Sequence, residues 1–198
     1  MKDGVLWHES HRCRGDPTPA SAQVHSTYED DLATPEDSSR RYEIVDGELF
    51  VTPTPRFRHQ EVVANLIATL RTLARAHGVG KVVGGPITVR LHDDTITEPD
   101  VVFLRVDRLH LVESGRIHGP PDLVVEVLSP SNRGYDRNLK RKRYLASGVA
   151  ELWIVDADEN TVEVWRPGEE LRTISSGSFE WRVGERTFEI ALEEIFRG

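Results

Sequence analysis

The chain has 198 residues, of which 38% are hydrophobic and 29% are charged. This length allows one domain with a sizeable core, and the composition is that of an ordinary globular protein. No apolar run approaches the roughly 20 residues that a membrane-spanning helix needs, and the first residues lack the apolar stretch of a signal peptide. We therefore expect a cytoplasmic protein that does not associate with membranes.

The formal net charge of −8 argues against tight, indiscriminate nucleic-acid binding, because phosphate contacts need a surplus of Lys and Arg. A local basic segment, RGYDRNLKRKRY, is nevertheless present, and it fits either a phosphate-binding groove or a solvated helix face. Cys13 is the only cysteine, which excludes an intrachain disulfide and a cysteine-built zinc site. Any metal would therefore be held by Asp, Glu, His or carbonyl groups, and oxygen ligands suit Mg²⁺, Mn²⁺ or Ca²⁺.

Residues 1–26 are polar and lack an apolar period, which predicts a flexible N-terminal tail. A single domain is predicted over residues 27–198, with a short helix at Tyr28–Ala33. Two β-rich runs then flank Asp46-Gly47, which is a strong hairpin signal.

The clearest helix is predicted from about Phe57 to His77, with Gly78 ending it. Apolar residues recur every three or four positions along this segment and form one stripe. They are Val62, Val63, Leu66, Ile67, Leu70 and Leu73.

The rest of the chain alternates short strands with one further helix. Strands are predicted in KVVGGPITVRLHDD (two), EPDVVFL, PDLVVEVLS, VAELWIVD and TVEVWRP. Residues 105–120 are expected to be irregular, with a helical turn at 106–109. The second helix is expected over about residues 136–147, ended by Gly148, and the C-terminal part is expected to hold one or two short strands and a helical turn. The order predicts an α/β fold with one curved sheet and helices packed on it.

Glu126 is the most unusual residue of the PDLVVEVLS strand. Strand alternation places it on one face with Val124 and Leu128, in a strand whose composition indicates burial on both faces. A buried carboxylate is costly unless a cation, a metal or a catalytic role compensates for it. The alternative is an edge strand in which Glu126 reaches water or pairs with an arginine.

Asp100 opens the EPDVVFL strand and shares its face with Val102 and Leu104. A Pro-Asp pair at a strand start is also a common turn device. Two carboxylates from neighbouring strands, however, would form an oxygen clamp for a divalent ion, which can activate water and neutralise charge on a phosphate. Glu98, two residues earlier, is a spare candidate or an exposed loop residue.

Three further residues are candidates for the same site. Lys140, near the start of the second helix, could orient water or offset charge on phosphoryl oxygens; alternatively it forms a surface pair with Asp136. His59 begins the long helix, where anions are favoured, although its role could be structural. Glu43 lies in the preceding strand and could simply point outward.

Other catalytic motifs are absent from the sequence. There is no glycine-rich phosphate loop, GxSxG elbow, HExxH pair or dinucleotide-binding fingerprint.

The chain resembles the Uma-two family of bacterial restriction endonucleases, also called domain of unknown function 820, in three blocks: RYEIVDGELFVTPTP…RHQ, EPDVVFL, and PDLVVEVLSPSNRGYDRNLKRKRYLASGVAELWIVDADENTVEVWR. The resemblance spans about residues 28–195. It implies membership of the PD-(D/E)xK nuclease superfamily and a restriction-endonuclease-like α/β fold, with a mixed β-sheet core and flanking helices.

The resemblance also implies roles for particular residues. It places the two acids of the nuclease signature on Asp100 and Glu126, with Mg²⁺ or Mn²⁺ as the cofactor that they hold. The superfamily's lysine usually follows the second acid by two residues, where this chain has Leu128, and the resemblance assigns that lysine to Lys140. His59 and Glu43 match positions of the opening motifs. DNA as substrate and a homodimer are further implications.

Three functional hypotheses follow. The first is a Mg²⁺- or Mn²⁺-dependent endonuclease acting on DNA, with basic residues of 133–142 near backbone phosphates. These are Arg133, Arg137, Lys140, Arg141 and Lys142. The second is a catalytically inactive nuclease-fold module that binds nucleic acid or a protein partner, which the acidic total and the displaced lysine favour. The third is a hydrolase of a small phosphoester.

Overall fold

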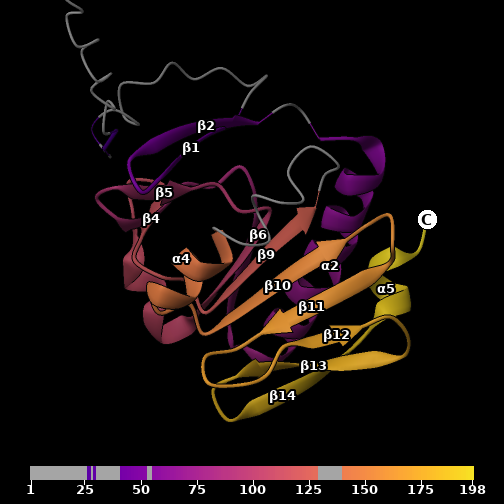
Figure 1. Ribbon diagram of the computed structural model, residues 1–198. Helices are drawn as coiled ribbons and strands as arrows, with labels where there is room; N and C mark the ends of the chain where they lie inside the picture. The colour runs from indigo at the N-terminus through magenta and orange to yellow at the C-terminus, as the bar shows by residue number, and fades with distance from the viewer. Residues whose placement is uncertain (1–25, 28, 30–40, 53–54, 129–139) are drawn as a thin grey trace, which may run out of the picture.

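Two six-stranded sheets and a separate hairpin form the body of the protein in a computed structural model that describes residues 26–27, 29, 41–52, 55–128 and 140–198 (Figure 1). Nearly all of the predicted N-terminal tail (residues 1–26) and of the predicted helix over residues 28–33 lie outside these ranges. In this part of the chain no helix is both long enough and apolar enough to cross a membrane.

The first sheet, called sheet A here, contains the predicted hairpin. Its strands are β1 (Arg41–Val45), β2 (Glu48–Thr52), β4 (Val89–His92), β5 (Thr95–Thr97), β7 (Val112–Glu113) and β8 (Arg116–His118). They are ordered β2-β1-β5-β4-β8-β7. Asp46 and Gly47, between β1 and β2, have positive φ angles of 55° and 75°, as a two-residue hairpin turn requires. The hairpin prediction is confirmed.

The second sheet, called sheet B, is mixed and carries most of the core. Its strands are β3 (Gly80–Gly84), β6 (Val101–Arg105), β9 (Leu123–Leu128), β10 (Glu151–Asp156), β11 (Thr161–Trp165) and β12 (Arg172–Ile174). The order is β12-β11-β10-β9-β6-β3, in which β9 and β10 run parallel and the other neighbours run antiparallel.

Helix α2 (Phe57–His77) covers one face of sheet B and has the predicted bounds. Its C-terminal Gly78 adopts the left-handed conformation, which costs glycine no steric penalty. The predicted apolar stripe supplies Val62, Leu66 and Leu70 to a core with Val125 and Trp153 of sheet B. The hairpin of β13 (Ser178–Val183) and β14 (Arg186–Ala191) and helix α5 (Leu192–Phe196) complete this core.

The opposite face of sheet B is covered by sheet A and by helix α4 (Arg141–Ala146). Figure 1 shows α2 behind β9–β11 and α4 in front of them. Val89 of sheet A and Tyr144 of α4 pack with Val102 and Val124 of sheet B in a second core. We call the surface of sheet B that carries Val102 and Val124 its inner face, because it lies against sheet A.

The structure corrects three expectations about the elements. One curved sheet was expected, but the strands divide into two sheets, because Val89 and Ile117 pack against sheet B instead of extending it. Residues 105–120 are not irregular after the helical turn η1 (Val106–Leu111), since β7 and β8 pair there. The C-terminal part has three strands, β12–β14, instead of one or two.

Candidate active site

Strands β6 and β9 bring the two predicted acids to one end of sheet B. The antiparallel register pairs Val101 with Val125 and Val102 with Val124. One further step along this register places Asp100 opposite Glu126, and side chains opposed in this way have Cβ atoms about 4.5–5.5 Å apart on the same face. Both acids follow the alternation of Val102 and Val124, so they lie on the inner face.

Asp100 is 2% exposed, and one of its oxygens contacts groups of β9 and of α2. Its Oδ2 accepts a hydrogen bond of 2.8 Å from the backbone N–H of Val127, on the neighbouring strand β9. The same oxygen lies 3.2 Å from Nε2 of His59, at the start of α2. The sheet register and the helix therefore both orient this carboxylate.

Glu126 is 4% exposed in a strand whose six residues are all buried. Its Oε1 accepts a hydrogen bond of 2.6 Å from the hydroxyl of Tyr144 and lies 3.4 Å from Nζ of Lys140. The expected burial on both faces of the strand is confirmed, and the edge-strand alternative is wrong because β9 lies between β6 and β10.

Lys140 forms ion pairs with an acid of each sheet. Its ammonium lies 2.7 Å from Oε2 of Glu43 in sheet A and 3.4 Å from Oε1 of Glu126 in sheet B. The lysine is 4% exposed, so the alternative of a surface pair does not describe it. Asp136, the partner in that alternative, lies outside the described residues.

Glu43 is 2% exposed and faces the same cluster. The suggestion that it simply points outward is wrong, because β1 is covered and its carboxylate is bound on both oxygens. Oε1 accepts a hydrogen bond of 2.8 Å from the backbone N–H of Glu98, and Oε2 binds Lys140. Glu98 is half-buried and presents its N–H to Glu43, so it is not the exposed loop residue of the alternative.

The structure thus brings all five predicted residues into one buried cluster: Glu43, His59, Asp100, Glu126 and Lys140. Their chemical roles stay predictions. Nδ1 of His59 is buried without a hydrogen-bond partner in the described part of the chain. An unsatisfied buried polar atom is costly, so this nitrogen is a polar group beside the cluster that the described residues leave unexplained.

Tyr144 is a member of the cluster that the sequence analysis missed. It is fully buried and donates to Glu126. Burial, followed by the negative charge of Glu126, raises the pKa of the Tyr144 hydroxyl well above its ordinary value, so this group remains a donor at neutral pH. A usable signal existed, since Tyr144 stands four residues after Lys140, and residues at that spacing share one face of a helix.

The basic segment contributes less to the surface than expected. Lys140 is buried, and the guanidinium of Arg141 stacks 4.2 Å from the centre of the Trp165 ring. Lys142 is exposed. Arg133 and Arg137 lie outside the described residues. Of the four basic residues of this segment that the structure describes, Lys142 alone is exposed, while Arg143 forms an ion pair with Asp46.

The donor set fits a hard divalent cation. Mg²⁺ commonly binds through one or two carboxylates and retains several waters, and Asp100 and Glu126 supply two carboxylates on one face. No group of three or more His, Cys, Asp or Glu side chains suited to a metal exists among the described residues, so an all-protein cage does not form there. The five-residue cluster sets three carboxyl groups against one lysine, and a cation would offset this excess of acidic groups.

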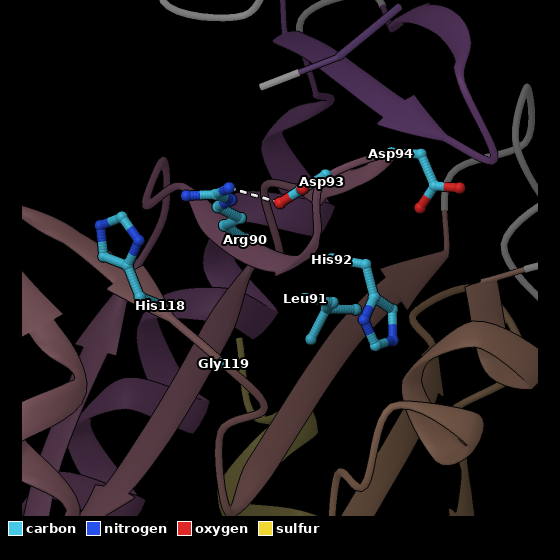
Figure 2. Close-up of a pocket in the computed structure, with 7 residues that line it drawn as sticks. All are labelled: Arg90, Leu91, His92, Asp93, Asp94, His118 and Gly119. Carbon is cyan, nitrogen blue, oxygen red and sulfur yellow. Dashed lines mark hydrogen bonds and ion pairs between the residues drawn. The ribbon is translucent and has the colours of Figure 1, made fainter. Parts of the chain in front are cut away.

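A separate surface pocket of about 700 Å³ is formed by residues 90–94 with His118 and Gly119 (Figure 2). None of the five predicted residues lines it. Arg90 forms an ion pair with Asp93, and in this view the rings of His92 and His118 lie on opposite sides of that pair. His92 also lies 3.0 Å from the Ser147 hydroxyl. The pocket therefore has no convergent ligand set, and the buried cluster is the better candidate site.

Comparisons with known proteins agree with this architecture. The family model Uma2, described as "Putative restriction endonuclease", matches residues 27–193. A solved structure described as a "putative nuclease belonging to DUF820 from Anabaena variabilis ATCC 29413" matches with a TM-score of 0.70 and 21% identity, over 86% of this chain and 97% of that chain. No curated protein sequence matches. At this identity the structural likeness shows a shared fold, and it confirms the predicted fold class.

Proposed function

This chain belongs to the Uma2 family of restriction-endonuclease-like proteins, and we propose that it is a metal-dependent endonuclease that hydrolyses phosphodiester bonds of DNA. The observation that carries the proposal is the convergence of Asp100, Glu126 and Lys140. Asp100 directly precedes β6, one register step beyond the Val101–Val125 pair and opposite Glu126 of β9, and the ammonium of Lys140 lies 3.4 Å from Glu126.

Asp100 and Glu126 are the residues that would hold Mg²⁺ or Mn²⁺. Bound there, the cation would lower the pKa of a water and neutralise negative charge that develops on the phosphoryl group. Val127 and His59 hold the Asp100 carboxylate, and Tyr144 holds that of Glu126. These donors keep both carboxylates oriented before any ligand arrives, which reduces the reorganisation that binding and reaction require.

Lys140 supplies the fixed positive charge of the proposed mechanism. The superfamily's usual lysine position is Leu128, which is 5% exposed and packs in the second core. Lys140 instead reaches Glu126 from the position just before α4, and Glu43 also binds its ammonium. A lysine held in this way can position a water or stabilise a phosphoryl oxygen. The geometry thus supports a displaced lysine more than a lost one.

The second candidate is a catalytically inactive module that binds nucleic acid or a protein. The burial of Lys140 between two carboxylates and the stacking of Arg141 on Trp165 favour it, because both reduce the cationic surface offered to phosphates. Titration calorimetry with Mn²⁺ separates the two candidates. Binding that is lost in Asp100→Asn favours the nuclease, and no binding at millimolar metal favours the module.

The decisive test is cleavage by purified variants. We expect Asp100→Asn and Glu126→Gln each to reduce Mg²⁺- or Mn²⁺-dependent DNA cleavage by roughly 100-fold or more, because each removes a carboxylate that would hold the cation. The measurement is cleavage of labelled DNA, with RNA of the same sequence as a parallel substrate.

Asp122→Asn is the matched control. Asp122 precedes β9, at the end opposite Glu126, where it accepts hydrogen bonds from the Arg105 backbone and the Arg108 side chain. This variant should lose stability but keep its activity while folded. Equal cleavage by all three variants would show that the activity comes from elsewhere. The homodimer and the cytoplasmic location implied above stay predictions, and a solution mass measurement tests the first.

A further inference from the structure

Thr97 is a buried residue whose hydroxyl has no hydrogen-bond partner in the part of the chain that the structure describes. It is the last residue of β5 and is 1% exposed. A hydroxyl buried without a partner destabilises the folded state, because it loses its hydrogen bonds to water. Such a group calls for a physical explanation.

The register of sheet A shows which way Thr97 faces. Ile44 of β1 pairs with Ile96 of β5, so the next step of this antiparallel ladder places Glu43 opposite Thr97, on the same face. On its other side Thr97 pairs with Val89, which packs against the inner face of sheet B. Thr97 therefore faces the space that holds Glu43 and Lys140.

Thr95 provides an internal comparison. It lies two residues earlier on the same strand and is also 1% exposed. Its hydroxyl donates a hydrogen bond of 3.1 Å to Asp94. One buried hydroxyl of β5 is thus satisfied within the protein, whereas the one beside the cluster is not.

We propose that Thr97 is a positioning residue that binds a water molecule beside the Glu43–Lys140 ion pair and holds it for hydrolysis. The role in hydrolysis rests on the proposed nuclease function; the binding of the water does not. Buried waters typically make about three hydrogen bonds to polar groups that would otherwise be unsatisfied. The Thr97 hydroxyl, the Lys140 ammonium and the Glu43 carboxylate are groups of the right kind, with both donors and acceptors among them.

This arrangement explains why a buried threonine is useful there. The ammonium of Lys140 can donate to the water oxygen, and the carboxylate of Glu43 can accept one of its protons. The hydroxyl of Thr97, which can both donate and accept, would make the third hydrogen bond to the water. A water held by three groups has few orientations, and restricting orientation is a recognised contribution to catalysis.

The test compares Thr97→Val with Thr97→Ser and Thr95→Val. Valine keeps the shape of threonine and removes only the hydroxyl, so Thr97→Val should still fold, which a melting temperature verifies. Its kcat should fall roughly 10- to 100-fold while KM changes less than about twofold. Thr97→Ser, which retains a hydroxyl, should restore most of kcat. Thr95→Val should lose some stability and keep kcat.

A crystal structure gives a readout that is independent of activity. We expect a water oxygen about 2.5–3.0 Å from Oγ1 of Thr97 in the native protein, and none at that position in Thr97→Val. A native structure without this water, or an unchanged kcat in Thr97→Val, overturns the proposal. If the native protein cleaves no substrate while the water is present, the nuclease proposal fails and the binding of the water by Thr97 stands.

Discussion

At the scale of single residues, Tyr144 shows how burial defines a role. Its hydroxyl donates to Glu126 from a site without solvent contact. A phenol in such a place keeps its proton, because the phenolate would be desolvated and would lie beside a carboxylate. Tyr144 therefore acts as a permanent donor that orients Glu126.

Tyr144→Phe is expected to lower the free energy of unfolding by about 1.5–3 kcal/mol at neutral pH, because a hydrogen bond to a charged group is lost. The pKa of Tyr144 is raised in the folded protein, so the unfolded chain ionises first. The contribution of the protonated phenol to the free energy of unfolding is fully present below about pH 10, and it declines as the pH rises above that value. Denaturant unfolding between pH 7 and 11 measures this decline, which should be shallower in Tyr144→Phe.

Tyr42→Phe is the control for that prediction. Tyr42 lies in β1, next to Glu43, and is half-buried. This variant removes the hydroxyl of a half-buried tyrosine and should lower the free energy of unfolding at neutral pH by less than Tyr144→Phe does. A Tyr144→Phe variant with the native profile would show that Tyr144 is not the group that ionises.

At the scale of elements, the order of β3, β6 and β9 determines where Asp100 lies. Strand β3 pairs along the whole of β6, and this pairing depends on a close approach at Gly80. A Cβ atom there would lie 2.1 Å from the carbonyl oxygen of Leu104 and 2.6 Å from the ring of Phe103. The ring has little room to move, because it packs edge-on against Trp181.

Gly80→Ala is therefore expected to destabilise the protein by about 1–3 kcal/mol or more, since backbone must shift to relieve the overlap. Thermal or denaturant unfolding checks this value. Lys81→Ala, at the next residue, which is exposed, should change stability by less than about 0.5 kcal/mol. Equal effects from the two substitutions would contradict the steric explanation.

The strands also show how well the alternation of residues along the sequence predicts the face on which a side chain lies. Strand alternation placed Glu126 with Val124 and Leu128, and Asp100 with Val102, and the structure has these groupings on the inner face. The alternation of β1 gave no direction for Glu43, because both faces of that strand contain buried residues, such as Ile44 and Glu43 itself. The face of β1 that meets the buried cluster is determined by sheet A folding over sheet B.

At the scale of the whole molecule, sheet B holds two buried charged clusters with different properties. Glu151, the first residue of β10, forms a two-pronged pair with Arg166, at 3.0 and 2.9 Å. It also accepts a hydrogen bond from Trp153, and Arg166 donates to the backbone of Glu180. Both partners are saturated by protein groups. The candidate active site differs, because unsatisfied atoms of His59 and Thr97 border it.

Arg166→Met is expected to cost about 3–5 kcal/mol of stability, because it leaves Glu151 buried and unpaired. The activity of the folded fraction should not change. Denaturant unfolding and cleavage assays measure the two effects. Arg182→Met, which removes an exposed arginine paired with Glu169 and Glu180, should have little effect on stability. A large loss in both variants would indicate that arginine packing, rather than buried charge, is responsible.

The sequence by itself determined the features that depend on neighbours along the chain. These include the helix over residues 57–77, the turn at Asp46-Gly47, and the face that Asp100 and Glu126 each occupy in their own strands, since backbone periodicity relates residues a few positions apart. The residue pattern also raised Lys140, Glu43 and His59 as candidates, and the family resemblance supported them, but neither gave their positions in the fold.

The tertiary structure determined which residues of different elements face one another. It divided the strands into two sheets and brought Glu43 and Thr97 of one sheet against the inner face of the other. It also placed Tyr144 on Glu126 and buried Lys140 between two acids. These contacts join segments that are distant in the chain, so they depend on how complete elements pack, and no local pattern encodes that packing.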